Sequence, residues 1–222
     1  MPTNRRNFLK LAALAGGGAG LGLVPTANNV LAAVGKAAKP LRILILGGTG
    51  FTGPFQVKYA LGRGHQVAVF NRGKTHPGEL PKRAEQLLGD RNGKLDALKG
   101  RQWDVCIDIP TTLPVWVRDA ARILKGNVDR YVFISTVSVY SDTSKPGMDE
   151  SGPLAKYEGA DAMKETQKTL LASKFALYGP LKVRAEREAE KWFPGKSLII
   201  RPGLIAGPGD ESDRLFKLKK YS

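Results

Sequence analysis

The feature that most constrains the fold of this chain is a glycine-rich turn between a strand pattern and a helix pattern. Residues 41–46 form a Leu- and Ile-rich run, which is typical of a buried parallel strand. The run leads directly into Gly47, Gly50 and Gly53, and Pro54 follows at a position suited to the first turn of a helix. A strand, three glycines at this spacing and a helix, in this order, are the context that a dinucleotide-binding fingerprint requires.

Each glycine of this turn has a physical role in such a site. Gly47 permits the tight turn, Gly50 lets the backbone approach a pyrophosphate, and Gly53 lets the helix pack on the sheet. Backbone N–H groups at the helix start then bind phosphate. The simpler alternative is a glycine turn without a ligand, and the order of the elements favours the cofactor. The cofactor-binding residues predicted in the turn are Gly47, Thr49, Gly50, Phe51 and Gly53.

Strand and helix patterns alternate along the rest of the chain. Further strands are expected at 65–70, 85–88, 103–109, 130–135 and 197–200. Helices are expected at 54–61, 95–99, 113–125, 161–174 and 178–192, and residues 141–160 have the composition of a loop. This alternation predicts an α/β fold, a doubly wound parallel sheet of the Rossmann type, over residues 40–210.

The end of the second strand bears on which dinucleotide is bound. An acidic residue there usually holds the adenosine ribose of NAD, but this chain has Asn71 and Arg72. Arg72 could pair with a 2′-phosphate, which favours NADP over NAD, and the alternative is an arginine that stacks on adenine or faces water. Asp90 at the end of the third strand is the candidate for an adenine contact, although an ordinary loop aspartate explains it nearly as well.

A Tyr-x-x-x-Lys pattern occurs once, at Tyr178 and Lys182. Four residues make about one helical turn, so both side chains share a face. An ammonium one turn away favours the phenolate form of a tyrosine, and the pair can then exchange protons with a hydroxyl or a ketone. Pro180 is compatible with this only if the helix begins near Tyr178. Taken alone, the pattern is common enough to be a surface pair.

Together, four motifs resemble the extended short-chain dehydrogenase/reductase family, and more narrowly its NAD-dependent epimerase/dehydratase group. They are Gly-Gly-Thr-Gly-Phe-Thr-Gly at 47–53, Val-Phe-Ile-Ser-Thr-Val-Ser-Val-Tyr at 132–140, the Tyr178–Lys182 pair and Arg-Pro-Gly at 201–203. The resemblance implies that Thr136 hydrogen-bonds the substrate oxygen, with Ser135 as the substitute. It implies that Tyr178 exchanges the proton and that Lys182 also holds the nicotinamide ribose. A hydroxyl that merely caps the strand end is the alternative at 135–136.

The first 33 residues have the pattern of an export signal. Arg5 and Arg6 precede Phe-Leu-Lys, an apolar Gly- and Ala-rich stretch covers 11–24, and small residues near 31–33 could accept a signal peptidase. The run resembles a twin-arginine (Tat) signal, which implies the Tat translocase as a partner and a periplasmic or extracytoplasmic location. The apolar stretch is too short and too glycine-rich for a membrane anchor.

The other end of the chain predicts an incomplete substrate lobe. Members of the family continue well past the Arg-Pro-Gly strand, whereas residues 211–222 end in a basic tail without a pocket-forming pattern. We therefore expect a Rossmann domain that lacks most of the C-terminal substrate lobe. A homodimer through 113–125 and 161–192 is implied by the resemblance, and no residue pattern establishes it.

The resemblance implies a small-molecule substrate, namely a sugar or a nucleotide-sugar. An exported enzyme meets little free dinucleotide, and an epimerase or dehydratase that returns its hydride within one cycle could work with one cofactor loaded before export. The competing hypotheses are a non-catalytic nucleotide- or RNA-binding relative, which a net charge of +15 would suit, and an inactive fragment. The export signal argues against RNA.

No metal site is expected. The single cysteine, Cys106, lies in an apolar run and can form neither an intrachain disulfide nor a metal cluster. His65 and His76 have no partner at ligand spacing and are interpreted as surface residues.

Overall fold

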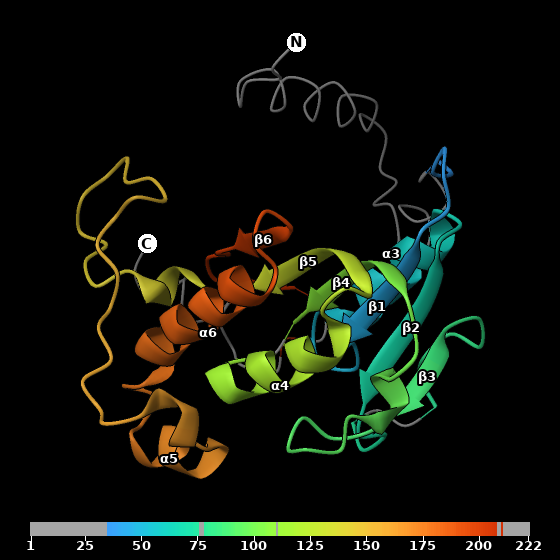
Figure 1. Cartoon of the computed structure of the whole chain (residues 1–222). Coiled ribbons are helices and arrows are strands. Elements are labelled where there is room, and N and C mark those ends of the chain that lie inside the picture. Colours follow the sequence, from blue (N-terminus) through green and yellow to red (C-terminus); the bar gives the residue numbers. More distant parts are fainter. Residues whose placement is uncertain (1–34, 76–77, 110, 208–209, 211–222) are drawn as a thin grey trace, which may run out of the picture. The chain divides into compact units, whose positions relative to one another are not determined.

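The computed structural model describes residues 35–75, 78–109, 111–207 and 210 (Figure 1). The export signal predicted at 1–33, the basic tail at 211–222 and His76 lie outside these residues. No helix in the part of the chain that the structure describes is long and apolar enough to cross a membrane.

Six parallel strands form one sheet in the order β3-β2-β1-β4-β5-β6. The strands are β1 (Arg42–Leu46), β2 (Gln66–Asn71), β3 (Glu85–Leu88), β4 (Trp103–Asp108), β5 (Val128–Ile134) and β6 (Ser197–Ile200). The chain builds outward from β1 to β3, then returns to the other side of β1 and builds outward again. This arrangement confirms the predicted doubly wound sheet. It also places a crevice at the carboxyl ends of β1 and β4, where the strand order reverses.

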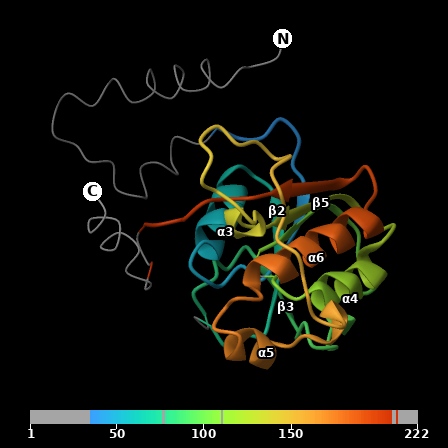
Figure 2. The same cartoon turned by 90° about the vertical axis from the view of Figure 1, so that its left-hand side faces the viewer.

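Helices cover both faces of the sheet (Figures 1 and 2). Within the described residues the α-helices are α3 (Gly53–Gly62), α4 (Pro114–Leu124), α5 (Gln167–Ala172) and α6 (Tyr178–Trp192). The short 3₁₀ turns there are η1 (Asp96–Leu98), η2 (Val137–Val139) and η3 (Ala162–Lys164). Helices α4 and α6 pack together on one face, and α3 packs on the other. The central strands are therefore buried from both sides, which is why they are apolar almost without interruption.

The core on the α4–α6 side is the larger of the two. Its buried residues come mainly from the strands β1 to β5 and from the inner faces of α4 and α6. The rings of Tyr131 and Phe193 stack there, with their centroids 4.3 Å apart. The core on the α3 side includes Val57 of the helix and Val69 of β2, both fully buried. Apolar burial on two faces fixes the sheet, so the carboxyl ends of its strands are rigid supports for a site.

The structure corrects two details of the sequence prediction. A continuous helix was expected at 161–174, but the segment is divided into η3 and α5, because Asp161 caps the first turn and a capping box between Thr166 and Thr169 starts a new helix. His65 is half-buried rather than a surface residue, and its Nδ1 accepts a hydrogen bond of 3.0 Å from the Leu41 amide. The histidine thus ties the start of β1 to the loop before β2.

Candidate functional site

The glycine turn at the end of β1 adopts a conformation that depends on glycine. Gly47 and Gly48 have φ angles of +107° and +80°, in the left-handed region that other residues rarely adopt. The Gly47 amide donates to the Phe70 carbonyl at 2.8 Å, which anchors the turn to β2. Gly48 was not among the predicted residues, yet a Cβ there would lie only 2.7 Å from Cγ1 of Val69. The only sequence signal that could have identified Gly48 was its position directly after Gly47.

Gly53 and Gly50 have opposite surroundings. A Cβ at Gly53 would overlap the backbone of Gly48, so this glycine lets the first turn of α3 pack on the loop. A Cβ at Gly50 would meet no atom within 4 Å, because Gly50 faces a cavity. The backbone at Gly50 is therefore open to close approach by a ligand. These are the surroundings that a pyrophosphate on a helix N-terminus requires.

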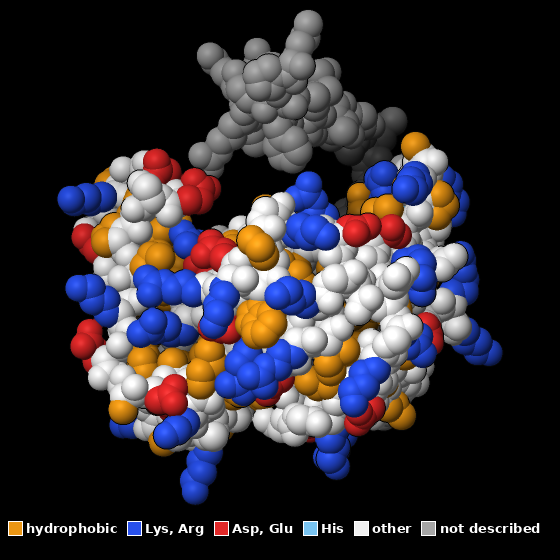
Figure 3. All heavy atoms as spheres, viewed as in Figure 1, with side chains coloured by type: hydrophobic (Ala, Val, Ile, Leu, Met, Phe, Trp, Pro, Cys, Tyr) orange, Lys and Arg blue, Asp and Glu red, His pale blue; other side chains and the backbone are white. Residues whose placement is uncertain are grey.

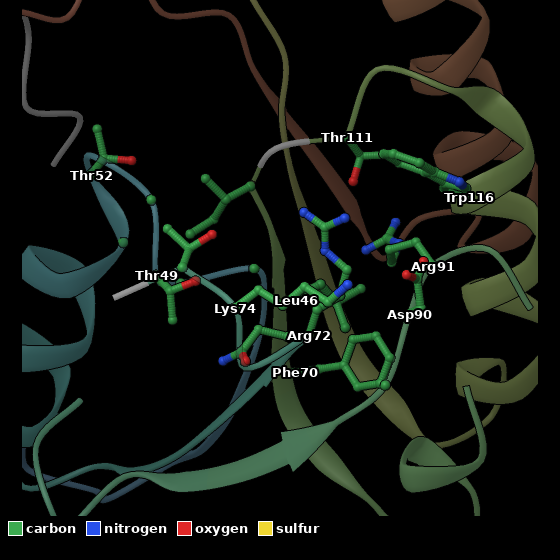
Figure 4. A pocket seen from close by; sticks show the side chains of 18 of the residues that line it. Leu46, Thr49, Thr52, Phe70, Arg72, Lys74, Asp90, Arg91, Thr111 and Trp116 are labelled. Carbon is green, nitrogen blue, oxygen red and sulfur yellow. The ribbon is translucent and has the colours of Figure 1, made fainter. Parts of the chain in front are cut away.

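The cavity beside this turn, here called the glycine-turn cavity, has a volume of about 540 Å³. All five cofactor-binding residues predicted in the turn line it, and so do Asn71, Arg72 and Asp90. In Figure 4, Thr49 and Thr52 approach from the turn, Arg72 and Arg91 from the ends of β2 and β3, and Thr111 and Trp116 from the segment after β4. The structure thus brings the predicted cofactor residues, Lys182 apart, around one space.

At the end of β2, Asn71 is fixed and the cations beside it are exposed. The Asn71 Oδ1 accepts hydrogen bonds from the Gly73 amide at 2.6 Å and from the Gln86 side chain at 3.1 Å. Its Nδ2 is buried and has no hydrogen-bond partner among the described residues. Arg72 and Lys74 are exposed and line the cavity. Lys74 was not predicted, although its place two residues after Arg72 could have suggested a second cation.

At the end of β3, Asp90 lines the cavity but already serves the loop. Its Oδ1 accepts hydrogen bonds from the amide and the side chain of Asn92, at 2.8 and 2.9 Å. The adjacent Arg91 forms two hydrogen bonds with the Asp108 carboxylate, at 3.0 and 2.8 Å. Asp90 therefore stays a predicted ligand contact, and Arg91 is a wall of the cavity that sequence reasoning missed.

Asp108 is the centre of a buried polar cluster under the glycine-turn cavity. Besides Arg91, the hydroxyls of Thr111 and Tyr131 donate to its carboxylate, the latter at 2.5 Å. Burial alone would raise the pKa of Asp108, but the charge and hydrogen bonds of Arg91 outweigh it and hold this pKa below its usual range. Burial and the Asp108 charge raise the pKa of Tyr131 well above its usual value. The cluster is thus a fixed ion pair with a neutral phenol.

A second, more open cavity of about 1110 Å³ adjoins the first, and we call it the Tyr178 cavity. The two cavities share Thr52, Ile109 and Ile205 in their walls. All three predicted catalytic residues, Thr136, Tyr178 and Lys182, line it. Thr136 lies just after β5, and Tyr178 is the first residue of α6. A Cβ at Gly179 would overlap the Ser138 carbonyl, so only a residue as small as glycine lets α6 begin this close to the end of β5.

Lys182 is buried at the back of this cavity. Its Nζ donates to the Ile134 carbonyl at 2.5 Å and lies 4.6 Å from the centroid of the Phe133 ring. Burial lowers the pKa of Lys182 to about 8, although Asp108 and Glu186 act in the opposite direction. Near neutral pH the ammonium form is therefore held in an environment that opposes its charge, as is common at functional sites.

The hydroxyls at the end of β5 differ in their bonding. The Thr136 Oγ1 accepts from the Ser138 amide and donates to the Ser138 Oγ, both at 3.2 Å. The Ser135 Oγ is buried and has no partner within the described residues. In the same part of the chain, no hydrogen bond joins the Tyr178 hydroxyl to Thr136 or Lys182. The three predicted catalytic residues share a cavity without direct bonds between them.

Arg201, in the Arg-Pro-Gly motif, holds the walls of the Tyr178 cavity together. Its guanidinium binds both carboxylate oxygens of Glu186 in α6, at 3.0 and 2.8 Å. It also donates to the Tyr140 hydroxyl at 3.0 Å and to the Glu150 carbonyl at 3.1 Å. One side chain thus connects β6, α6 and the 141–160 loop. The described residues contain no group of three or more His, Cys, Asp or Glu side chains suited to a metal ion.

Comparison with known proteins identifies relatives of the fold. No family model matches the chain. A curated relative, the chloroplast stem-loop binding protein of 41 kDa b from Arabidopsis thaliana, is 27% identical over an alignment 211 residues long that covers 83% of this chain and 54% of that protein.

Among solved structures, a UDP-galactose 4-epimerase superposes with a TM-score of 0.61 at 19% identity, covering 81% of this chain and 63% of that one. The UDP-glucuronic acid 4-epimerase from Bacillus cereus, solved in complex with NAD, gives 0.58 at 19% identity, covering 79% and 60%. The chain thus has the Rossmann-like fold of these epimerases and spans about half to two thirds of the length of the relatives it matches.

Proposed function

We propose that this chain binds NADP or NAD in the glycine-turn cavity and acts as an epimerase/dehydratase-like oxidoreductase on a sugar or nucleotide-sugar. The observation that carries the proposal is the junction of the two cavities at the carboxyl edge of the sheet. One cavity has the features of a dinucleotide cradle. The other contains a hydroxyl, a phenol and an ammonium group suited to proton transfer. A dinucleotide that follows the shared wall would reach from one to the other.

The residues of the glycine-turn cavity fit a dinucleotide. Gly50 leaves room for the pyrophosphate, and the orphaned Nδ2 of Asn71 is a buried donor that a ligand could satisfy. Arg72 and Lys74 favour NADP, because two exposed cations at the end of β2 suit a 2′-phosphate and the described segment 71–75 contains no carboxylate.

In the Tyr178 cavity we assign the proton to the Tyr178 hydroxyl. Thr136 donates to the substrate oxygen, Tyr178 exchanges the proton, and Lys182 would hold the nicotinamide ribose from its place beside the Ile134 carbonyl. The bound nicotinamide would supply hydride transfer to and from the substrate carbon. The buried Ser135 hydroxyl is a second donor for the same oxygen.

The proposal is tested by titrating NADPH into the protein and following its fluorescence. Gly50→Val should abolish binding without lowering thermal stability, because a Cβ there meets no atom within 4 Å and the side chain would extend into the cavity. Gly62→Val is the matched control, since a Cβ at Gly62 also meets no atom within 4 Å but lies outside the cavity. Equal affinity in the two variants would contradict the proposed cradle.

We further propose that the chain is exported by the Tat pathway with its cofactor already bound. Tat carries folded proteins, and a hydride that returns to its donor within one cycle makes cofactor exchange unnecessary. The support is the pairing of Arg5 and Arg6 with a nucleotide fold. Replacing both arginines by lysine should retain the precursor in the cytoplasm, as seen by fractionation and mass measurement. Unchanged export would refute this route.

RNA binding is a second candidate function. It is favoured by the name of the curated relative and by the net charge of +15. It predicts a gel shift with a stem-loop RNA that weakens steeply as salt rises. The shift should be insensitive to Gly50→Val. A protein that shifts no RNA at low salt would remove this candidate.

A further inference from the structure

The turn between α5 and α6 contains two strained residues in succession. Lys174 and Phe175 have φ angles of +48° and +66°, and they are the only non-glycine residues with positive φ in the described chain. Helices commonly end on a single left-handed residue, which is usually glycine. Left-handed backbone at two bulky residues is costly, and such strain is found mostly where the position of a side chain matters for function.

Hydrogen bonds hold this turn in its conformation. The Lys174 amide donates to the Leu171 carbonyl at 3.0 Å, and the Tyr178 amide donates to the Phe175 carbonyl at 2.9 Å. The Ser173 hydroxyl donates to the Leu170 carbonyl at 2.7 Å and accepts from the Leu177 amide at 3.3 Å. The turn is therefore a rigid connection that ends at Tyr178.

The strained turn presents an aromatic ring at the mouth of the Tyr178 cavity. Phe175 is 58% exposed and lines the cavity three residues before Tyr178. Leu171, on α5 of the same segment, is equally exposed at 55% but lines neither cavity. Exposure of a Phe ring loses the free energy that its burial would give. The turn thus uses a strained backbone to place an apolar face beside the predicted catalytic residue.

The rest of the Tyr178 cavity has one kind of charge. Its described walls contain the ammonium groups of Lys156 and Lys182 and no carboxylate, together with hydroxyls of serine, threonine and tyrosine. Lys182 is bonded to the Ile134 carbonyl, whereas Lys156 is exposed. This lining suits a ring that carries several hydroxyls and an anionic substituent.

From these observations we infer that Phe175 is a substrate-binding residue, whose ring packs on the apolar face of the reacting sugar, and that Lys156 binds an anionic group of the same substrate. The inference rests on the proposed function and specifies its substrate class as an anionic sugar. It adds a specificity determinant to the proton-transfer residues. The anion is a phosphate or a carboxylate, and the choice of probes distinguishes them.

The experiment uses saturation-transfer NMR and titration to measure how the protein binds three sugar probes in the presence of saturating NADP⁺. The probes are UDP-glucose, glucose 1-phosphate and glucuronate, and UDP serves as the probe without a sugar. The wild type should bind at least one sugar probe, with saturation on the ring C–H protons. Phe175→Ala should weaken that binding by about tenfold, as loss of an aromatic stacking contact does, and Leu171→Ala should not. Lys156→Gln should weaken it by a similar factor, with Lys168→Gln as its exposed control.

A further variant separates binding from structure. Phe175→Gly removes the ring and the left-handed strain together, so its thermal midpoint should equal or exceed that of wild type while sugar binding falls. If the Phe175 ring only stabilised the turn after α5, its removal would instead lower the thermal midpoint and leave the affinity for the sugar probes unchanged.

Three results would overturn the inference. The first is equal affinity of Phe175→Ala and Leu171→Ala for the sugar probes. The second is a loss of UDP binding in Phe175→Ala as large as its loss of sugar binding. The third is a wild type that binds none of the sugar probes. Fluorescence titration with NADPH on the same samples keeps the two proposals apart. Retained NADPH binding leaves the cofactor site standing when the sugar subsite fails, whereas loss of NADPH binding in the wild type removes the proposed function itself.

Discussion

Replacing Lys182 by methionine should make the folded protein more stable near neutral pH, although it removes a predicted catalytic group. The side chain is 3% exposed, and burial lowers its pKa from 10.5 to about 8. Because the folded state binds this proton less tightly than the unfolded chain, holding the ammonium inside the protein costs free energy at every pH below 8. The cost disappears as pH rises from 8 towards 10.5.

The magnitude follows from the two pKa values. A displacement from 10.5 to about 8 corresponds to about 3 kcal/mol of destabilisation at neutral pH. Methionine keeps most of the apolar stem but loses the hydrogen bond to the Ile134 carbonyl, which is worth about 1 kcal/mol. We therefore expect a net gain of about 2 kcal/mol at pH 7.

The assay is urea unfolding of both proteins between pH 7 and 10.5. The wild type should gain stability relative to Lys182→Met as pH rises through this range, so the difference between them shrinks. Lys168→Met, at an exposed position, controls for the loss of one surface charge. A Lys182→Met protein that is less stable than wild type at pH 7, or a difference that does not change with pH, would refute the reasoning.

Three further predictions follow from the same site. Asp108→Ala should destabilise the fold by about 3–5 kcal/mol in urea unfolding, because it leaves the Arg91 guanidinium buried without its partner. The lowered pKa of Asp108 adds stability that is present above the unfolded pKa of 3.8 and is lost as pH falls below it. The difference in stability between the wild type and Asp108→Ala should therefore shrink in acid, and a difference that does not change with pH would mean that the pair is unimportant. Arg72→Ala should weaken NADPH binding about tenfold and NADH binding little, measured by fluorescence titration, whereas an equal loss for both would exclude a 2′-phosphate contact. Gly53→Ala should lower both thermal stability and NADPH affinity, because its Cβ overlaps the Gly48 backbone, and a variant with wild-type stability would contradict that packing.

The sequence predicted the fold well because its strongest patterns are local. The apolar runs and the glycine turn at 47–53 lie next to each other along the chain, and they determine the doubly wound sheet almost alone. Once parallel strands are assumed, their carboxyl ends must meet at one edge, so Thr136 and the turn were placed correctly relative to the sheet. The predicted roles of these residues stay predictions.

The misses depend on contacts between distant residues. Arg91 and Asp108 are 17 residues apart and meet only because β3 and β4 end at the same edge. Arg201 and Glu186 are 15 residues apart and meet because α6 packs against β5 and β6. The division of 161–174 into η3 and α5 came from a Thr166–Thr169 capping box, whose local pattern was present but weaker than the helical spacing around it. Left-handed backbone at Phe175 has no recognisable sequence pattern, because neither residue of the turn is glycine.

The central claim is that the glycine turn holds a dinucleotide. Native mass spectrometry of the purified protein tests it most directly, with NADP⁺ and NAD⁺ added in separate samples. The account predicts one dinucleotide per chain, retained in the gas phase and released on denaturation, with NADP⁺ preferred and none on Gly50→Val. A wild-type chain that keeps neither dinucleotide would contradict it.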